Sequence, residues 1–222
     1  MYAYFAPGGG LWPRYYLEQV LGMPLLRVEL PRRLSPGQCR KIERRLRRFR
    51  VHQTLNHPQT WRGPALPAQN ATRELWLEVA PELALRALMA RNIDPRYASV
   101  ELVAEHWSAP AEQILLSLIP RVRRIVLSVP VPEGLLWHLQ REAGFSPGVG
   151  QGDVALCLSP AVRKNAIPLW PPRPAVPGFS LSTARPTGAE DCPVEPLLAA
   201  LRQSGRLGRE DIILCADGAH LT

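Results

Sequence analysis

Short, nearly continuous apolar runs alternate along the chain with segments in which apolar residues recur every three or four positions. The first pattern is typical of strands that are covered on both faces, and the second of amphipathic helices. The predicted strands are 2–5, 25–30, 99–104, 124–129, 153–158 and 211–216. This alternation predicts the α/β class, as a three-layer, Rossmann-like, mostly parallel sheet with helices on both faces.

Helical periodicity and capping residues place the helices between these runs. Helices are predicted over 36–50, 71–91, 110–119, 133–143 and 194–204. Asn70 is a suitable N-cap for the second of them, and Pro81 should kink or split it, because proline removes a backbone donor and clashes with the preceding turn. Gly144 suits the position just after the end of the fourth helix.

The stretch 160–196 differs from the rest, since it carries nine prolines. Such a segment cannot form a helix and makes a poor central strand, so we expect an extended, proline-rich wrap. The predicted organisation is therefore an α/β core over 1–159, and a C-terminal part, 160–222, in which the wrap is followed by a helix and a last strand.

Three consecutive glycines, Gly8, Gly9 and Gly10, follow the first predicted strand and precede a helix-like stretch. Backbone amides at the start of a helix bind anions, which makes these glycines possible ligand-binding residues. The dinucleotide spacing is incomplete, because Pro13 occupies the third glycine position, and no lysine followed by serine or threonine completes a Walker loop. A flexible connection is the alternative interpretation.

Residues 99–160 resemble the outline of a Rossmann half-domain from a dehydrogenase, with strand, helix, strand, helix and strand in succession. The resemblance is topological only, because the glycine turn is replaced by residues 104–107, and Glu105 would repel a pyrophosphate. We therefore expect no NAD and no other cofactor. Ligands of open α/β sheets bind beyond the carboxyl ends of strands, where His106, Ser128 and Arg163 are possible ligand contacts.

Composition narrows the class of function. The hydrophobic content of 46% is ample for a core, and no apolar run is long enough to cross a membrane. The four cysteines are far apart and form no CxxC pair, as expected for free thiols in a cytoplasmic protein without a zinc site. The sequence holds no nucleophile elbow and no HExxH helix, so we predict no catalytic residues and no metal ligands.

The net charge of +8 is local. Residues 27–50 hold ten basic and two acidic side chains, and the remaining residues hold 17 of each sign. Within the helix predicted over 36–50, apolar residues Cys39, Ile42, Leu46 and Phe49 share one face. The opposite face carries the predicted anion-binding residues, Arg40, Lys41, Arg44, Arg47 and Arg48. Like charges four residues apart repel, so this helix favours an anionic partner, with a solvated face as the alternative.

These observations predict a soluble binding protein rather than an enzyme, with nucleic acid backbone or an acidic protein as its partner. One alternative is a Rossmann-like enzyme that binds a small ligand or nucleotide at the glycine loop. Another is a subunit of a larger assembly, because Trp137 points away from the apolar stripe of its helix and exposed tryptophans anchor protein contacts.

Overall fold

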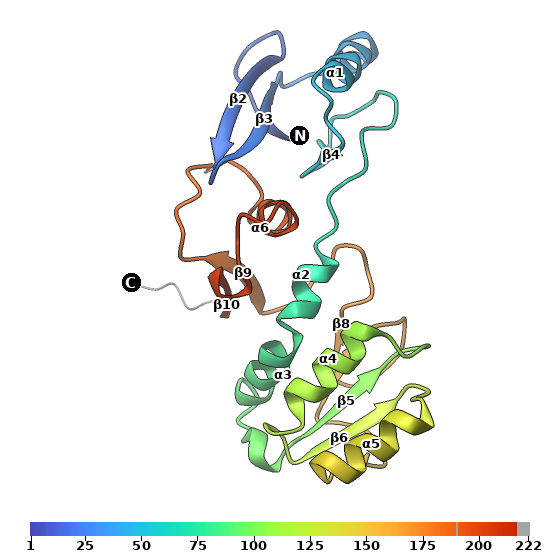
Figure 1. Ribbon diagram of the computed structural model, residues 1–222. Coiled ribbons are helices and arrows are strands. Elements are labelled where there is room, and N and C mark those ends of the chain that lie inside the picture. The colour runs from blue at the N-terminus through green and yellow to red at the C-terminus, as the bar shows by residue number, and fades with distance from the viewer. Residues whose placement is uncertain (190, 217–222) are drawn as a thin grey trace. The chain divides into compact units, whose positions relative to one another are not determined.

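The computed structural model describes residues 1–189 and 191–216 and shows a mixed α/β fold (Figure 1). The chain divides into two compact units. Unit 1 is formed by Met1–Thr72 together with Ser180–Cys215, and unit 2 is formed mainly by Arg73–Phe179. Unit 1 is therefore discontinuous in sequence, with unit 2 inserted between its two segments.

Sheet A of unit 1 has four strands in the order β2-β3-β1-β4. These strands are β1 (Tyr2–Pro7), β2 (Arg14–Val20), β3 (Met23–Leu30) and β4 (Gln53–Thr54). Strand β1 is parallel to β3 and β4, with Tyr2 opposite Leu25 and Pro7 opposite Leu30. Strand β2 is antiparallel to β3 and forms one edge of the sheet.

Two helices bury the faces of sheet A. Helix α1 (Pro36–Arg48) packs its apolar residues on the face that carries Ala3 and Phe5. Side chains alternate along a strand, so Tyr2 and Tyr4 lie on the other face. There helix α6 (Val194–Gln203) approaches, and the Tyr2 hydroxyl donates a hydrogen bond of 3.2 Å to the Gln203 side chain. Five consecutive residues of α6, from 197 to 201, are buried.

A two-stranded sheet joins β9 (Phe179–Thr183) to β10 (Ile212–Ala216), and a 3₁₀ turn (Arg209–Asp211) leads into the second strand.

Sheet B of unit 2 is entirely parallel, with strand order β6-β5-β7-β8. Its strands are β5 (Ser99–Val103), β6 (Arg124–Ser128), β7 (Val154–Cys157) and β8 (Ala166–Pro168). The helices of this unit are α2 (Arg73–Glu78), α3 (Ala80–Met89), α4 (Ala109–Leu118) and α5 (Glu133–Ala143), with a 3₁₀ turn at Pro95–Tyr97. Helix α3 packs against β7 and α4.

Most predicted elements are confirmed, including the interruption near Pro81, which lies in the first turn of α3. The helix predicted after the glycines is wrong, because residues 14–20 form strand β2. The parallel strands also lie in two separate sheets, whereas the sequence pattern predicted one. Within the proline-rich stretch, residues 166–168 and 179–183 are strands.

No helix among the described residues combines the length and the apolar character needed to span a bilayer.

Candidate functional site

Helix α1 is fixed at its start by a complete capping box. The hydroxyl of Ser35 accepts a hydrogen bond from the Gln38 amide at 3.2 Å, and the Gln38 side chain accepts one from the Ser35 amide at 2.9 Å. Two backbone donors that the helix leaves unpaired are thereby satisfied. Pro36 occupies the first turn, where its missing N–H has no consequence.

The buried face of α1 fixes the direction of its cations. Cys39, Ile42 and Leu46 are fully buried in the core of sheet A. Phe49, which the sequence pattern placed on the same face, is instead half-exposed at the end of the helix, where its ring lies 6.4 Å from that of Tyr15. Rotation of the helix about its axis would expose this apolar stripe, so the opposite face must remain in solvent.

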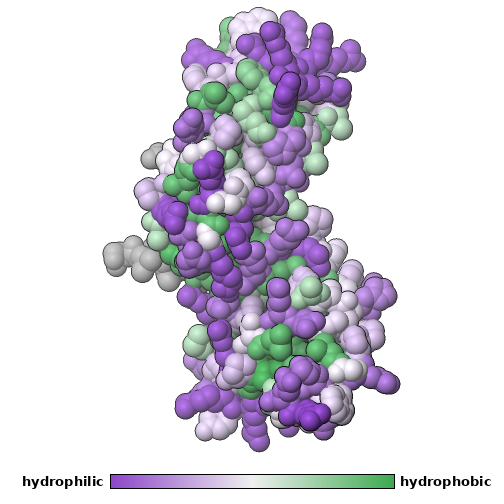
Figure 2. Space-filling view, viewed as in Figure 1, coloured by the Kyte–Doolittle hydropathy of each residue, from purple (hydrophilic) through white to green (hydrophobic). Residues whose placement is uncertain are grey.

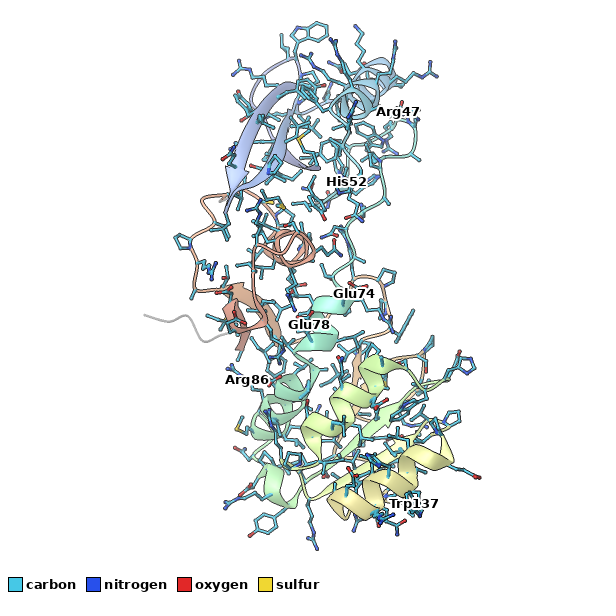
Figure 3. All side chains as sticks on the ribbon, in the orientation of Figure 1. Arg47, His52, Glu74, Glu78, Arg86 and Trp137 are labelled. Carbon is cyan, nitrogen blue, oxygen red and sulfur yellow. The ribbon has the colours of Figure 1, made fainter. Side chains whose placement is uncertain are left out.

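The predicted anion-binding side chains are all exposed on that opposite face, namely Arg40, Lys41, Arg44, Arg47 and Arg48. Figure 2 shows strongly hydrophilic side chains gathered over the region where Figure 1 places α1. Arg47, labelled in Figure 3, differs from the others because it forms an ion pair with Glu43 one turn earlier.

A shallow hollow of about 330 Å³ lies along the cationic face, and every residue that lines it is basic. Its lining consists of Lys41, Arg44, Arg45 and Arg48. Arg45 was not among the predicted residues, and its guanidinium lies 4.6 Å from the centre of the Tyr15 ring on β2. Among the described residues, none of these four cations has a carboxylate within ion-pair distance. The hollow therefore presents uncompensated positive charge.

Arg27, on strand β3 of sheet A, is compensated by carboxylates, unlike the cations that line the hollow of α1. Arg27 on β3 forms ion pairs with Glu29 at 3.0 Å and with Asp191 at 2.8 Å, and Glu18 lies 3.8 Å away. Carboxylates are thus placed beside Arg27 and not beside the hollow of α1.

The three glycines, Gly8 to Gly10, lie between strands β1 and β2 and not at the start of a helix. Since residues 14–20 form a strand, the expected anion site at a helix N-terminus does not exist there. The amide of Gly8 donates to the Leu30 carbonyl at 2.8 Å, which extends the pairing of β1 with β3. A side chain at Gly8 would lie 3.1 Å from that oxygen, whereas one at Gly9 would meet nothing within 4 Å.

Gly8 does line a pocket, together with residues from the ends of β1 and β3 and from the segment 58–60. The pocket has a volume of about 470 Å³ and is lined by Phe5, Ala6, Pro7, Gly8, Leu30, Pro31, Arg32, Pro58, Gln59 and Thr60. It lies at the carboxyl ends of the parallel strands β1 and β3, where α/β sheets commonly bind ligands. Arg32 is the only charged residue in its lining. Neither Gly9 nor Gly10 contributes to it.

Two of the predicted ligand contacts in unit 2 meet at a buried carboxylate. Glu101 on β5 has a side chain only 2% exposed, and it accepts hydrogen bonds from the Ser128 hydroxyl at 2.7 Å and from Arg163 Nε at 2.8 Å. Ser128 and Arg163 are therefore engaged with the protein itself. His106 is exposed and has no hydrogen bond or ion pair within the part of the chain that the structure describes.

The environment of Glu101 keeps it ionised. Burial by itself would raise its pKa, but the hydrogen bonds from Arg163 and Ser128 and the charge of Arg163 outweigh burial and hold the pKa below its ordinary value. Nearby, burial and the negative charge of Glu101 raise the pKa of the Cys157 thiol. Sequence reasoning missed Glu101, although a lone acidic residue inside the apolar run SVELV was a usable signal.

The other predicted features fall outside both sites. Trp137 on α5 is 60% exposed, and the Arg141 guanidinium lies 5.1 Å from its ring centre (Figure 3). A protein contact there stays a prediction. Cys39, Cys157 and Cys192 are buried free thiols, and Cys215 is a partly exposed one. Within the described residues, no three His, Cys, Asp or Glu side chains are grouped as metal ligands.

Neither a protein-family model nor any curated protein matches the chain.

Proposed function

We propose that this protein binds nucleic acid through the phosphate backbone, with α1 as the contact surface. The observation that carries the proposal is the hollow lined only by Lys41, Arg44, Arg45 and Arg48. Arginine and lysine neutralise phosphates and release condensed counterions, which supplies most of the affinity in sequence-independent binding.

The spacing of the cations favours a regular polyanion. Arg40, Arg44 and Arg48 follow one another at intervals of four residues, which is about 6 Å along a helix axis. Interfaces with proteins have an apolar, largely uncharged centre, whereas those with nucleic acid are polar and positively charged. The exposed face of α1 has the second character, and for this reason we prefer nucleic acid to an acidic protein.

Little sequence preference is expected. Base readout requires side chains that reach base edges or stack on bases. The ring of Tyr15, which lies beside α1, is covered by Arg45, and the ring of Phe49 lies against Tyr15. Contacts from α1 would then be confined to phosphates and sugars.

The salt dependence of binding tests this function. Five neutralised phosphates give a slope of log K against log salt of about −4.5 on duplex DNA and about −3.5 on single strands. Replacing Arg40, Arg44 and Arg48 together by Gln should make the duplex slope shallower by about three, if each meets one phosphate. The fold should persist, because all three side chains are exposed.

A matched control removes three exposed cations outside α1, by Arg62→Gln, Arg86→Gln and Lys164→Gln. This variant loses the same formal charge as the variant of α1. Comparing the two therefore separates the effect of net charge on binding from the effect of the cations on α1. An unchanged slope in the control supports the proposal. Equal slopes for the two triple variants, or a wild-type protein that ignores both duplex and single strands at low salt, would refute it.

We propose, as a second function, the binding of a small ligand in the pocket at the ends of β1 and β3, which continues the Rossmann-like interpretation. The pocket volume lies within the usual range for ligand sites, and apolar walls with one cation suit an apolar body that carries one anionic group. Titration calorimetry with small alkyl carboxylates and alkyl phosphates tests whether the pocket binds such ligands. Arg32→Gln is expected to weaken their binding. Absence of binding by the whole panel would refute the second function.

A further inference from the structure

Strand β2 is an unprotected edge of sheet A. Its consecutive residues Tyr16 and Leu17, which point to opposite faces of the sheet, are 40% and 70% exposed, and Trp12, just before the strand, is 67% exposed. Proteins usually protect such edges with lysine, proline or a bulge. The seven residues RYYLEQV contain no lysine and no proline, and they pair with β3 in unbroken register.

The hairpin turn determines which backbone groups of β2 point outward. Leu21 and Gly22 have φ angles of 49° and 77°, as in a two-residue turn with both central residues in the left-handed region. Val20 and Met23 then form the hydrogen-bonded pair that closes the hairpin, and every second residue pairs inward in the same way. The N–H and C=O groups of Tyr15, Leu17 and Gln19 consequently point away from β3.

These outward groups are available. None of the three residues has a further backbone or side-chain hydrogen bond in the part of the chain that the structure describes. Arg14, at the start of the same strand, is exposed and has no ion pair among the described residues. Glu18 bonds to the Tyr4 hydroxyl at 2.9 Å, yet its side chain remains 30% exposed.

We propose that β2 pairs antiparallel with β2 of a second copy of this chain, about a two-fold axis at Tyr16. In such a pair, the residues whose N–H and C=O groups point away from β3 must lie opposite one another. If five or more residues of the strand are to pair, the two-fold axis can then lie only at Tyr16, Leu17 or Glu18. Centring on Glu18 places two glutamates together, and centring on Leu17 places Arg14 opposite Val20. Only the axis at Tyr16 sets Arg14 opposite Glu18 of the second copy, twice by symmetry.

The same register accounts for the apolar residues at this edge. Tyr15 would form hydrogen bonds with Leu17 of the second copy, and the two Tyr16 side chains would be direct neighbours. Trp12 would lie opposite Val20 of the second copy, near its hairpin turn. Pairing would end at Pro13, which lacks the N–H that further pairing requires.

A disulfide between copies tests the register. Tyr16→Cys places two thiols at a non-hydrogen-bonded pair, where Cα atoms are about 4.5 Å apart and a disulfide is possible. The experiment is done in a Cys215→Ser background, because Cys215 is the one partly exposed native thiol in the described chain. Arg14→Cys is the control, since its thiols would be about 14 Å apart at 3.4 Å per residue.

The expected result is a covalent dimer for Tyr16→Cys and none for Arg14→Cys. Sedimentation of the wild type should show a reversible dimer. Arg14→Glu should weaken that dimer roughly tenfold by facing Glu18 with like charge, while Arg14→Lys should keep it. A monomeric wild type at high micromolar concentration, or crosslinking through Leu17→Cys in place of Tyr16→Cys, would overturn the proposal.

Discussion

Replacing Glu101 by Gln should destabilise unit 2 by about 2–3 kcal/mol at pH 7. The carboxylate accepts hydrogen bonds from Ser128, from Arg163 and from the Gly152 backbone. Hydrogen bonds to charged groups contribute about 1.5–3 kcal/mol each, and neutral ones about 0.5–1.5. Loss of the charge therefore weakens the bonds to Arg163 and Ser128 by about 1 kcal/mol each. In addition, the new amide N–H₂ group faces one of the donors from which the carboxylate accepted a hydrogen bond, so that donor loses its partner.

The effect should depend on pH. Since the pKa of Glu101 is lowered in the fold from its ordinary value of 4.5, the carboxylate contributes stability that is fully present above pH 4.5. That stability is lost as the pH falls through the lower, folded pKa. The difference between wild type and Glu101→Gln should therefore shrink on acidification below pH 4.5, because the protonated acid is also neutral.

Urea unfolding at pH 7 and at pH 3, together with hydrogen exchange of the β5 amides, would measure this difference. Glu105→Gln is the matched control, because Glu105 is exposed four residues later and should change stability by less than about 0.5 kcal/mol. The effect of Glu101→Gln should also be partly masked in an Arg163→Gln background, because the two residues share one interaction. Equal differences at both pH values would refute the assigned role of the charge.

Three further outcomes are expected. Ser35→Ala should destabilise the protein by about 1 kcal/mol in urea unfolding through loss of the capping box, whereas Ser108→Ala should have little effect, because the Ser108 side chain makes no cap hydrogen bond to α4. Gly63→Ala should lower the free energy of unfolding, measured with urea, by about 1–3 kcal/mol, because the new Cβ would lie within 3.0 Å of Cys39 Cβ, while Gly9→Ala should have little effect, because its Cβ would lie in open space. Cys192 should resist iodoacetamide at pH 8 in the native protein, since burial and the charge of Glu18 raise its pKa to about 12, and labelling before Cys215 would contradict this.

Local patterns predicted the helices well, because capping and periodicity are local signals. The start of α1 was predicted from the capping residues Ser35, Pro36 and Gln38, and the break between α2 and α3 from Pro81. The direction of the cations on α1 followed from the same periodicity. By contrast, the contact between Arg45 and Tyr15 could not be predicted, because Tyr15 lies on β2, a strand that the pattern had assigned as helix.

The error at β2 has a physical cause. RYYLEQV does not alternate, and its turn uses Leu21 in a left-handed conformation that usually requires asparagine, aspartate or glycine. The division into two sheets was not predictable either, since strand pairing depends on contacts between distant residues. Glu101 illustrates a third limit, because its partner Arg163 lies 62 residues away.

The discontinuity of unit 1 has a consequence for synthesis of the chain. The face of sheet A that carries Tyr2 is covered by α6, whose contact residue Gln203 follows 201 residues later. At about 5–20 residues per second, a ribosome needs about 10–40 s to make that stretch. During this interval the first segment of unit 1 has one apolar sheet face that α6 does not yet cover. Chaperones bind such exposed apolar surface, so we expect them to bind the nascent chain until residues 194–203 have been made.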